Sequence, residues 1–405
     1  MGGPLSGCRV IELSHIMAGP ACGLMLADMG ADVIKVEKAT GDDTRRSVPP
    51  DINGESAAYM MMNRNKRGIV LDLKSEGGKQ VLRRLIKDAD VVLENYRKGT
   101  MEKLGLGYDE LKKDNPSLIY AEISGFGRTG PYAERGGFDL IAQGMSGLMS
   151  ITGEGAGRQP VKVGAPVSDI TAGILAAMGV CAAYAHKLKT GEGQKVDTSL
   201  FEAAITHTYW QSAIAFATQE APEPMGSAHP LNAPYQAFQT SNGWINIGAA
   251  NQSNWEKLAM LINAPHLLDD PRFVTNAKRM ENRLALEGEL NGIICKRSTE
   301  DWLLAFEEGG LPSGPVLSIL DMHNDPQTKA RDMVPEVEHP IAGKMQTLGL
   351  PVKFSNTPGG VHSAAPLLGE HTREVLMEVG YDEEEAKRLI GSGAVSQYES
   401  IDGIT

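Results

Sequence analysis

The feature that most constrains the fold is a regular alternation of short β-rich runs with helical patterning through the first half of the chain. Each run is apolar on both sides of the pleat, which is typical of strands covered by helices on both faces. Strands separated by helices indicate βαβ units, and such units build parallel sheets with right-handed crossovers. We therefore predict an α/β domain with a Rossmann-like parallel sheet, whose strands occupy residues 8–13, 32–37, 68–73, 90–95, 117–124 and 195–200.

The second half of the chain indicates a smaller domain. A long helix is expected from about 170 to 188, with Ser168 or Asp169 as its N-cap. Further on, Asn242-Gly243 separates two β-like runs as a hairpin turn does, and helical patterns follow at 254–262, 276–292 and 299–309. We predict a large α/β domain at 1–218, a proline-rich linker at 219–234, a small α+β domain at 235–325 and a C-terminal segment at 326–405 that returns to the large domain.

Composition excludes several classes of partner. The 405 residues carry a net charge of −12, which argues against a nucleic-acid-binding surface. The cysteines lie far apart and the histidines show no metal-ligand spacing, so neither a disulfide framework nor a metal site is expected. No signal peptide is visible, and the longest apolar run, 172–185, is too short to span a bilayer. We expect a cytoplasmic protein that binds no membrane.

The stretch "ISGFGRTGPY", at 123–132, has the G-x-G-x-x-G spacing of a dinucleotide-binding loop. Such a loop follows the first strand of its sheet and opens a helix whose N-terminus faces the pyrophosphate. Here the stretch follows the fifth strand-like run, and no helix is expected before Phe138. We interpret it as a turn at the carboxyl end of a strand rather than as a site for NAD or FAD.

Several segments together resemble one family, the class III CoA-transferases that include formyl-CoA transferase and carnitine CoA-transferase. The resemblance runs essentially from end to end and implies a dimer of two interlocked chains. The segments that carry it are "VIELSHIMAGPACGLMLADMGADVIKVE" at 10–37, "NRNKRGIVLDLK" at 63–74, "VLENYRKGTMEKLGLGY" at 92–108, "SGFGRTGPY" at 124–132 and "PLLGEHTREVL" at 366–376.

The resemblance implies that Asp169, in "VGAPVSDITAGILAAMG", is the catalytic nucleophile. A carboxylate at a helix N-terminus is stabilised in its ionised form by the helix dipole, and an ionised carboxylate can attack a thioester carbonyl. The attack would give an aspartyl anhydride and then an aspartyl-CoA thioester, without a permanently bound cofactor. From the residues alone, without the resemblance, a helix cap would be the favoured role of Asp169.

Coenzyme A carries three phosphates, so its site needs local positive charge in spite of the acidic chain. The alternative for each basic residue is a solvated surface charge. By resemblance, the residues that line the CoA thioester are His15, Met17, Ala18, Lys38, Leu71, Lys74, Asn95, Tyr96, Arg97 and Lys103.

The acyl side of the site decides between branches of the family. A racemase of this family would need a histidine where Phe138 stands, and phenylalanine cannot move a proton. Asp139 corresponds to an acidic residue that assists transfer, or it is a helix N-cap. A dicarboxylate acceptor would need a charged partner, for which Arg45, Arg46 and His229 are candidates.

We therefore predict transfer of CoA from an acyl-CoA donor, expected to be succinyl-CoA, to a small dicarboxylic acid. The alternatives are an acyl-CoA isomerase, racemase or hydro-lyase of the same fold, and a non-catalytic acyl-CoA binder.

Overall fold

The computed structural model describes residues 2–398, which form two compact units. Unit 1 comprises the described residues up to 146, then 164–207 and those from 326 onward; unit 2 comprises 147–163 and 208–325. The division after residue 325 coincides with the expected boundary. Residues 147–163 and 208–218, expected in the large domain, belong to unit 2. The second of these segments contains α9 (Tyr209–Thr218), which buries none of its residues and so adds nothing to the core of unit 1.

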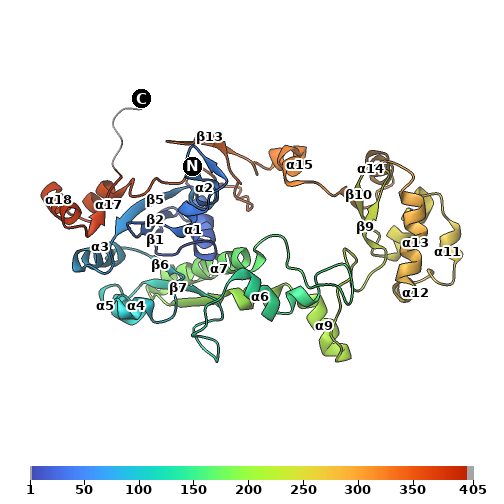
Figure 1. Cartoon of the computed structure of the whole chain (residues 1–405), viewed down its shortest axis with the longest axis horizontal. Helices are drawn as coiled ribbons and strands as arrows, with labels where there is room; N and C mark the ends of the chain where they lie inside the picture. Colours follow the sequence, from blue (N-terminus) through green and yellow to red (C-terminus); the bar gives the residue numbers. More distant parts are fainter. Residues whose placement is uncertain (1, 399–405) are drawn as a thin grey trace. The chain divides into compact units, whose positions relative to one another are not determined.

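A seven-stranded sheet forms the centre of unit 1, with the order β14-β5-β2-β1-β6-β7-β8 (Figure 1). All neighbours pair in parallel except β14, which pairs with β5 in the antiparallel sense. The predicted parallel sheet is thus confirmed, and its strand ends differ from expectation by at most two residues. The unpredicted strand β14 is too short to show a pattern. The strands are β1 (Arg9–Glu12), β2 (Asp32–Glu37), β5 (Lys66–Leu71), β6 (Val91–Glu94), β7 (Ile119–Ser124), β8 (Lys195–Ser199) and β14 (Val395–Ser396).

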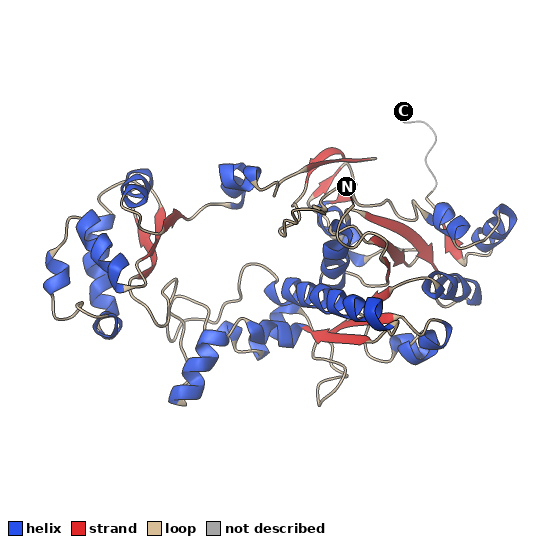
Figure 2. Ribbon diagram, turned by 180° about the vertical axis from the view of Figure 1, so that it is seen from behind, coloured by secondary structure: helices blue, strands red, loops and turns tan. Residues whose placement is uncertain are grey.

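Helices cover both faces of this sheet, as Figure 2 shows with strands in red and helices in blue. Successive strand residues alternate between two core clusters, so Val10 belongs to one and Ile11 to the other. The first cluster is completed by α1 (Ala18–Asp28), α6 (Asp139–Met145), α7 (Val167–Thr190) and α8 (Leu200–Thr206). The second is completed by α3 (Glu76–Lys87), α4 (Thr100–Lys103), α5 (Tyr108–Asp114), α17 (Thr372–Glu378) and α18 (Glu383–Gly391).

A smaller core cluster of unit 1 consists of Tyr59, Met60, Ala342 and Ala365, with Met345 packed against it. The remaining elements of unit 1 are the 3-10 turn η1 (Asp43–Arg46), β3 (Asp51–Ile52), β4 (Glu55–Ser56), α2 (Ala57–Asn63), α16 (Pro326–Ala330), β12 (Glu336–His339) and β13 (Gly343–Gln346), while the short turn η2 (Leu148–Ser150) belongs to unit 2.

The long helix α7 exceeds its expected length at both ends. By length and composition alone it could cross a membrane, with a mean hydropathy of 1.5 over its most apolar window. Its Ala172, Ala176 and Val180 are nevertheless buried in the sheet core. A Cβ on Gly173 would lie only 2.7 Å from the carbonyl oxygen of Ala18, so α7 and α1 pack backbone to backbone. These contacts are those of a core helix in a globular fold.

Unit 2 contains the predicted hairpin, with β9 paired to β10 around Asn242-Gly243. A third strand, β11, extends it into a small sheet. The single helix expected at 276–292 is divided at Asn282, whose backbone leaves the helical region. The elements are β9 (Tyr235–Gln239), β10 (Trp244–Gly248), β11 (Ser313–Pro315), α10 (Gln252–Leu261), α11 (His266–Asp269), α12 (Asn276–Glu281), α13 (Arg283–Ile294), α14 (Thr299–Glu308) and α15 (Ile319–Asn324).

Candidate active site

The order of the strands changes direction at β1. Strands β2 and β5 lie on one side of β1, and β6, β7 and β8 lie on the other. Open α/β sheets bind ligands at the carboxyl ends of the strands beside such a switch point. The side chain of Asn95, after β6, bridges this point: its Oδ1 accepts from the His15 N–H at 2.9 Å and its Nδ2 donates to the His15 carbonyl at 2.8 Å. The structure thus brings together two predicted segments that are far apart in sequence.

A cavity of about 100 Å³ opens at this edge of the sheet. The His15 and Tyr96 rings lie 5.7 Å apart in its wall, and Lys38 lies at its exposed side. Burial lowers the pKa of His15, which favours the neutral form of its ring. Lys38 pairs with Asp43 at 3.0 Å, and an anion at this place would have to compete with that carboxylate. The lining residues are Leu13, Ser14, His15, Val36, Glu37, Lys38, Gly41, Asp42, Asp43 and Tyr96.

The other residues expected along CoA differ in how available their side chains are. Met17 precedes the first residue of α1, and Ala18 is buried in its first turn. Leu71 is buried in the core between β5 and its covering helices, so only its backbone can face a ligand. The three basic side chains of this set, those of Lys74, Arg97 and Lys103, are at least partly exposed.

Asp169 lies in the first turn of α7 and is half-buried. The expectation that Ser168 or Asp169 caps this helix is wrong, because the helix already begins at Val167, and Pro166 at the cap position offers no side-chain hydrogen bond. Residues four apart lie on one face of a helix, so Asp169 shares the face of Gly173, which packs on the first turn of α1. Asp169 therefore points toward the α1 end of unit 1, where the His15–Ala18 segment begins that helix.

The missing cap comes from another helix. Asp139 opens α6, and its Oδ1 accepts the backbone N–H of Ser168 at 2.9 Å, while its Oδ2 accepts from Gln143 at 2.7 Å. Asp139 is thus not the N-cap of its own helix, a position that Phe138 occupies without a side-chain bond. It stabilises the N-terminus of α7 and places a second carboxylate beside Asp169.

This arrangement sets the protonation of Asp169. Burial, and then the charge of Asp139, raise the pKa of Asp169 to about 6. The helix N-terminus was expected to favour the ionised form, but desolvation and a like charge outweigh the dipole and make this carboxyl group less acidic than an exposed aspartate. The group is still mainly ionised at neutral pH, and it is more basic than an exposed aspartate.

The glycine-rich stretch forms a closed loop between β7 and α6. A Cβ on Gly125 would lie 2.7 Å from the Cα of Gly137, so the two ends of the loop touch through their backbones. The next helix begins only at Asp139. At the near end Arg128 donates to the Tyr96 carbonyl at 2.9 Å and to Glu94 at 2.6 Å. Sequence reasoning missed Arg128, whose only signal was a lone charge among glycines; it pairs with the buried carboxylates of Glu94 in β6 and Glu122 in β7.

The residues expected around the acyl groups have different surroundings. Arg45 binds the Glu37 carboxylate through Nε at 2.8 Å and Nη2 at 2.7 Å, and Nη2 also lies within hydrogen-bond distance of the Tyr59 hydroxyl and the Pro366 carbonyl, so these two nitrogens are engaged within unit 1. Arg46 is exposed and pairs with Asp43. Phe138 is 71% exposed.

His229 belongs to unit 2. Its ring stacks on Tyr235 at 5.2 Å, and its Nδ1 accepts from the Leu231 N–H at 3.1 Å.

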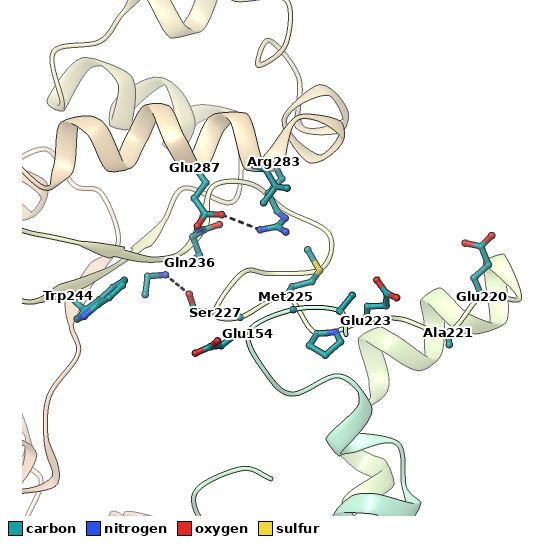
Figure 3. Close-up of a pocket in the computed structure, with 16 residues that line it drawn as sticks. Glu154, Glu220, Ala221, Glu223, Met225, Ser227, Gln236, Trp244, Arg283 and Glu287 are labelled. Atoms are coloured by element: carbon teal, nitrogen blue, oxygen red, sulfur yellow. Dashed lines mark hydrogen bonds and ion pairs between the residues drawn. The ribbon is translucent and has the colours of Figure 1, made fainter. Parts of the chain in front are cut away.

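Unit 2 contains a larger hollow of about 970 Å³, shown in Figure 3. Its labelled carboxylates are those of Glu154, Glu220, Glu223 and Glu287, the last of which pairs with Arg283 at 3.4 Å. None of the residues expected at the active site lines it. Throughout residues 2–398 no cluster of three or more potential metal ligands occurs.

Comparison with known proteins gives a consistent result. Residues 5–372 match the family model described as CoA-transferase family III. The chain is 40% identical to succinate–glutarate CoA-transferase of Agrobacterium fabrum, over 93% of this chain and 96% of that protein. It is 37% identical to succinyl-CoA:glutarate CoA-transferase of Mus musculus, over 98% and 91% respectively.

A further relative is the succinyl-CoA:mesaconate CoA-transferase of Haloarcula hispanica, at 38% identity over 93% of this chain and 97% of that protein. Among solved structures, a CaiB/BaiF family protein from Brucella suis superposes with a TM-score of 0.84 at 39% identity. That match covers 94% of this chain and all of the other.

Proposed function

The chain belongs to CoA-transferase family III, and from this premise we propose that it moves CoA from an acyl-CoA donor, succinyl-CoA, to a small dicarboxylic acid. The names of its relatives support both substrates, since three of them transfer CoA between succinate and glutarate or mesaconate. The observation that carries the proposal is Asp169 at the start of α7, with its pKa raised to about 6 beside Asp139.

The proposed chemistry exchanges nucleophiles at carbonyl carbons. The Asp169 carboxylate attacks the succinyl-CoA thioester, the C–S bond breaks, and CoA leaves as thiolate with the electron pair. The thiolate attacks the aspartyl carbonyl of the anhydride and releases succinate, which leaves an aspartyl-CoA thioester. The acceptor carboxylate displaces the thiolate to form a second anhydride. Thiolate attack on the acceptor's acyl carbon then gives the new acyl-CoA and restores Asp169.

The raised pKa suits this role. A carboxylate with a pKa of about 6 is mainly ionised at neutral pH but is more nucleophilic than one of ordinary acidity, because nucleophilic reactivity increases with basicity. Asp139 contributes to this basicity and holds the N-terminus of α7 in place through Ser168.

For CoA binding we propose the switch-point edge of unit 1. The pantetheine would follow His15, Met17 and Ala18, next to Asn95 and Tyr96. The phosphates would contact the basic side chains around that edge, which are those of Lys38, Lys74, Arg97 and Lys103. The backbone of Leu71 would lie beside the nucleotide.

For the distal carboxylate of the acceptor we propose Arg46 or His229. We do not assign this role to Arg45, because its side chain is only 12% exposed and its Nε and Nη2 already bind the buried Glu37 carboxylate.

We also propose that the active species is a cytoplasmic homodimer with interlocked chains. Exposed large apolar side chains on helices of each unit support contacts with a partner chain, since extended apolar surface on a soluble protein usually marks an interaction site. They include Leu140, Ile141 and Met145 on α6, Met178 and Leu188 on α7, and Tyr209, Trp210 and Phe216 on α9.

The test is incubation with succinyl-CoA and a panel of dicarboxylic acids, followed by mass spectrometry of the CoA esters. New acyl-CoA formed with release of one succinate per turnover is expected, and trapping with hydroxylamine should label Asp169. If α-protons of a bound acyl-CoA exchanged with deuterated water and no acid became esterified, an isomerase or racemase would replace the proposal.

A further inference from the structure

The proposed CoA site rests on a strained turn, and we propose that Asp42 is the positioning residue that holds it. Asp42 would keep Ile16 in a left-handed conformation, and this conformation gives the loop between β1 and α1 the shape that receives the CoA thioester. The inference rests on the proposed function for the identity of the ligand, but the strained turn and its anchor are properties of the free chain.

Ile16 has φ = 70°, in a region that β-branched residues avoid because Cβ meets the backbone. Strain of this kind persists only where neighbouring groups impose it, and it gathers at functional sites. Ile16 lies between His15 and Met17, both expected along CoA, and its side chain is 40% exposed. An apolar residue is thus held outward on the surface of the loop at a conformational cost.

Side chains from three other segments hold the backbone of this loop. The Ser14 carbonyl accepts from Lys35 Nζ at 2.9 Å. The His15 N–H and carbonyl are both bound by Asn95. The Ile16 N–H donates to the two carboxylate oxygens of Asp42 at 3.2 and 3.3 Å. Asp42 therefore acts at the strained residue itself.

Asp42 is itself firmly anchored. Its carboxylate pairs with Lys35 at 2.9 Å and accepts from the N–H and hydroxyl of Thr44, each at 2.9 Å. Lys35 is fully buried and also pairs with Glu12. Although burial acts to raise the pKa of Asp42, Lys35 and Thr44 hold that pKa well below its usual range, so the anchor stays charged at any working pH.

Asp42 has a second role that the experiment must separate: it caps the short turn η1 through Thr44. If this were its only contribution, replacing Asp42 would weaken CoA binding by the same factor whichever residue occupies position 16. If it holds Ile16 against strain, a glycine at 16, which adopts positive φ at no steric cost, should make Asp42 largely dispensable.

The experiment is a double-mutant cycle with Asp42→Ala, Ile16→Gly and the pair, in the full chain. Binding of free coenzyme A is measured by calorimetry, and amide exchange of residues 14–17 by mass spectrometry without ligand. Relief of strain predicts that Asp42→Ala weakens CoA binding about tenfold in the unaltered background but only about twofold in the Ile16→Gly background. The KM for acyl-CoA should rise more than kcat falls, and exchange across 14–17 should accelerate.

Asp28→Ala is the matched control, since Asp28 is another buried carboxylate of unit 1, paired with Arg64 at 2.6 Å. It should lower stability but leave CoA affinity and exchange at 14–17 unchanged. If Asp42→Ala does not fold, Asp42→Asn, which keeps an acceptor oxygen, takes its place with an expected loss of about threefold.

Equal effects of the Asp42 change in both backgrounds would overturn the inference. If the unaltered chain did not bind coenzyme A, the proposed function would fail, while the exchange measurement would still decide whether Asp42 holds the turn.

Discussion

The Asp139 carboxylate accepts the backbone N–H of Ser168 at 2.9 Å and so stands at the start of the helix that carries Asp169. One acidic residue thereby does two things for its neighbour: it orders the first turn of α7 and it opposes ionisation of Asp169. The two carboxylates form a functional pair in which one residue sets the basicity of the other.

The pair predicts the pH dependence of transfer. Because Asp169 must be ionised to attack, kcat/KM should rise with pH through an apparent pKa of about 6 and level off above about pH 7. Asp139→Asn removes the like charge while retaining an acceptor for the Ser168 N–H, so it should move this midpoint to lower pH. The measurement is a pH–rate profile of both proteins. An unchanged midpoint would show that burial alone sets the basicity of Asp169.

Replacing Asp169 should separate activity from stability. Asp169→Asn removes the nucleophile, and we expect transfer to fall by at least about a thousandfold while coenzyme A still binds. Since the pKa of Asp169 is raised from 3.8 to about 6 on folding, the unaltered chain loses stability as pH rises through this window.

At pH 7 the Asp169→Asn variant should therefore be more stable by roughly 1–2 kcal/mol, and this difference should vanish below about pH 4. Urea unfolding at pH 7 and pH 4 tests this expectation. A variant that retained turnover would disprove the nucleophilic role.

Arg45 and Arg46 are adjacent but should respond differently to substitution. Arg45→Ala leaves the Glu37 carboxylate, whose side chain is 1% exposed, without its main partner, so we expect a loss of roughly 3 kcal/mol in the free energy of unfolding. Arg46 is 56% exposed at its side chain, and Arg46→Ala should change stability by less than about 1 kcal/mol. Denaturant titration compares them. If the Arg45→Ala protein were stable and had a raised KM for the dicarboxylate, Arg45 would instead be assigned to bind the acceptor.

The closed glycine loop should not tolerate a methyl group where its ends meet. A Cβ on Gly137 would lie 2.5 Å from the Cα of Gly125, so Gly137→Ala must displace backbone on one side. We expect a several-fold loss of transfer, because Asp139 is two residues further on and its bond to Ser168 would shift. Gly288→Ala, in a helix of unit 2 with open space at its Cβ, is the control and should be neutral or slightly stabilising. Equal activity of both variants would contradict a role for this contact.

Periodicity alone was enough to predict the parallel sheet, since runs such as Val91–Glu94 are apolar on both sides and are separated by helical spacing. The position of Asp169 at a helix start could also be predicted, because a long apolar helix follows it directly. Local patterns cannot show which distant side chain completes a site. The cap of α7 comes from Asp139, and the turn at Ile16 is held by Asp42; neither pairing leaves any trace in spacing.

The same limit explains why the roles of Arg45 and Arg128 could not be predicted from the sequence. In the sequence alone, both are basic residues that follow strands, and either could bind a phosphate or a carboxylate. Their roles depend on Glu37 and Glu94, carboxylates buried at the ends of β2 and β6, and burial of a charge is known only once the layers are assembled.

The edge strand β14 has a consequence for how the chain is made. Val395 of β14, together with Val375 and Leu376 of α17, completes the core cluster on the α3 face of the sheet. A nascent chain therefore lacks this cover until Val395 has left the ribosome, whereas unit 2 has its own core and ends at residue 325. Unit 2 should therefore fold first. A chain truncated before Thr372 would leave the β5 edge of the sheet unpaired, and we expect it to be bound by chaperones or degraded rather than to become active.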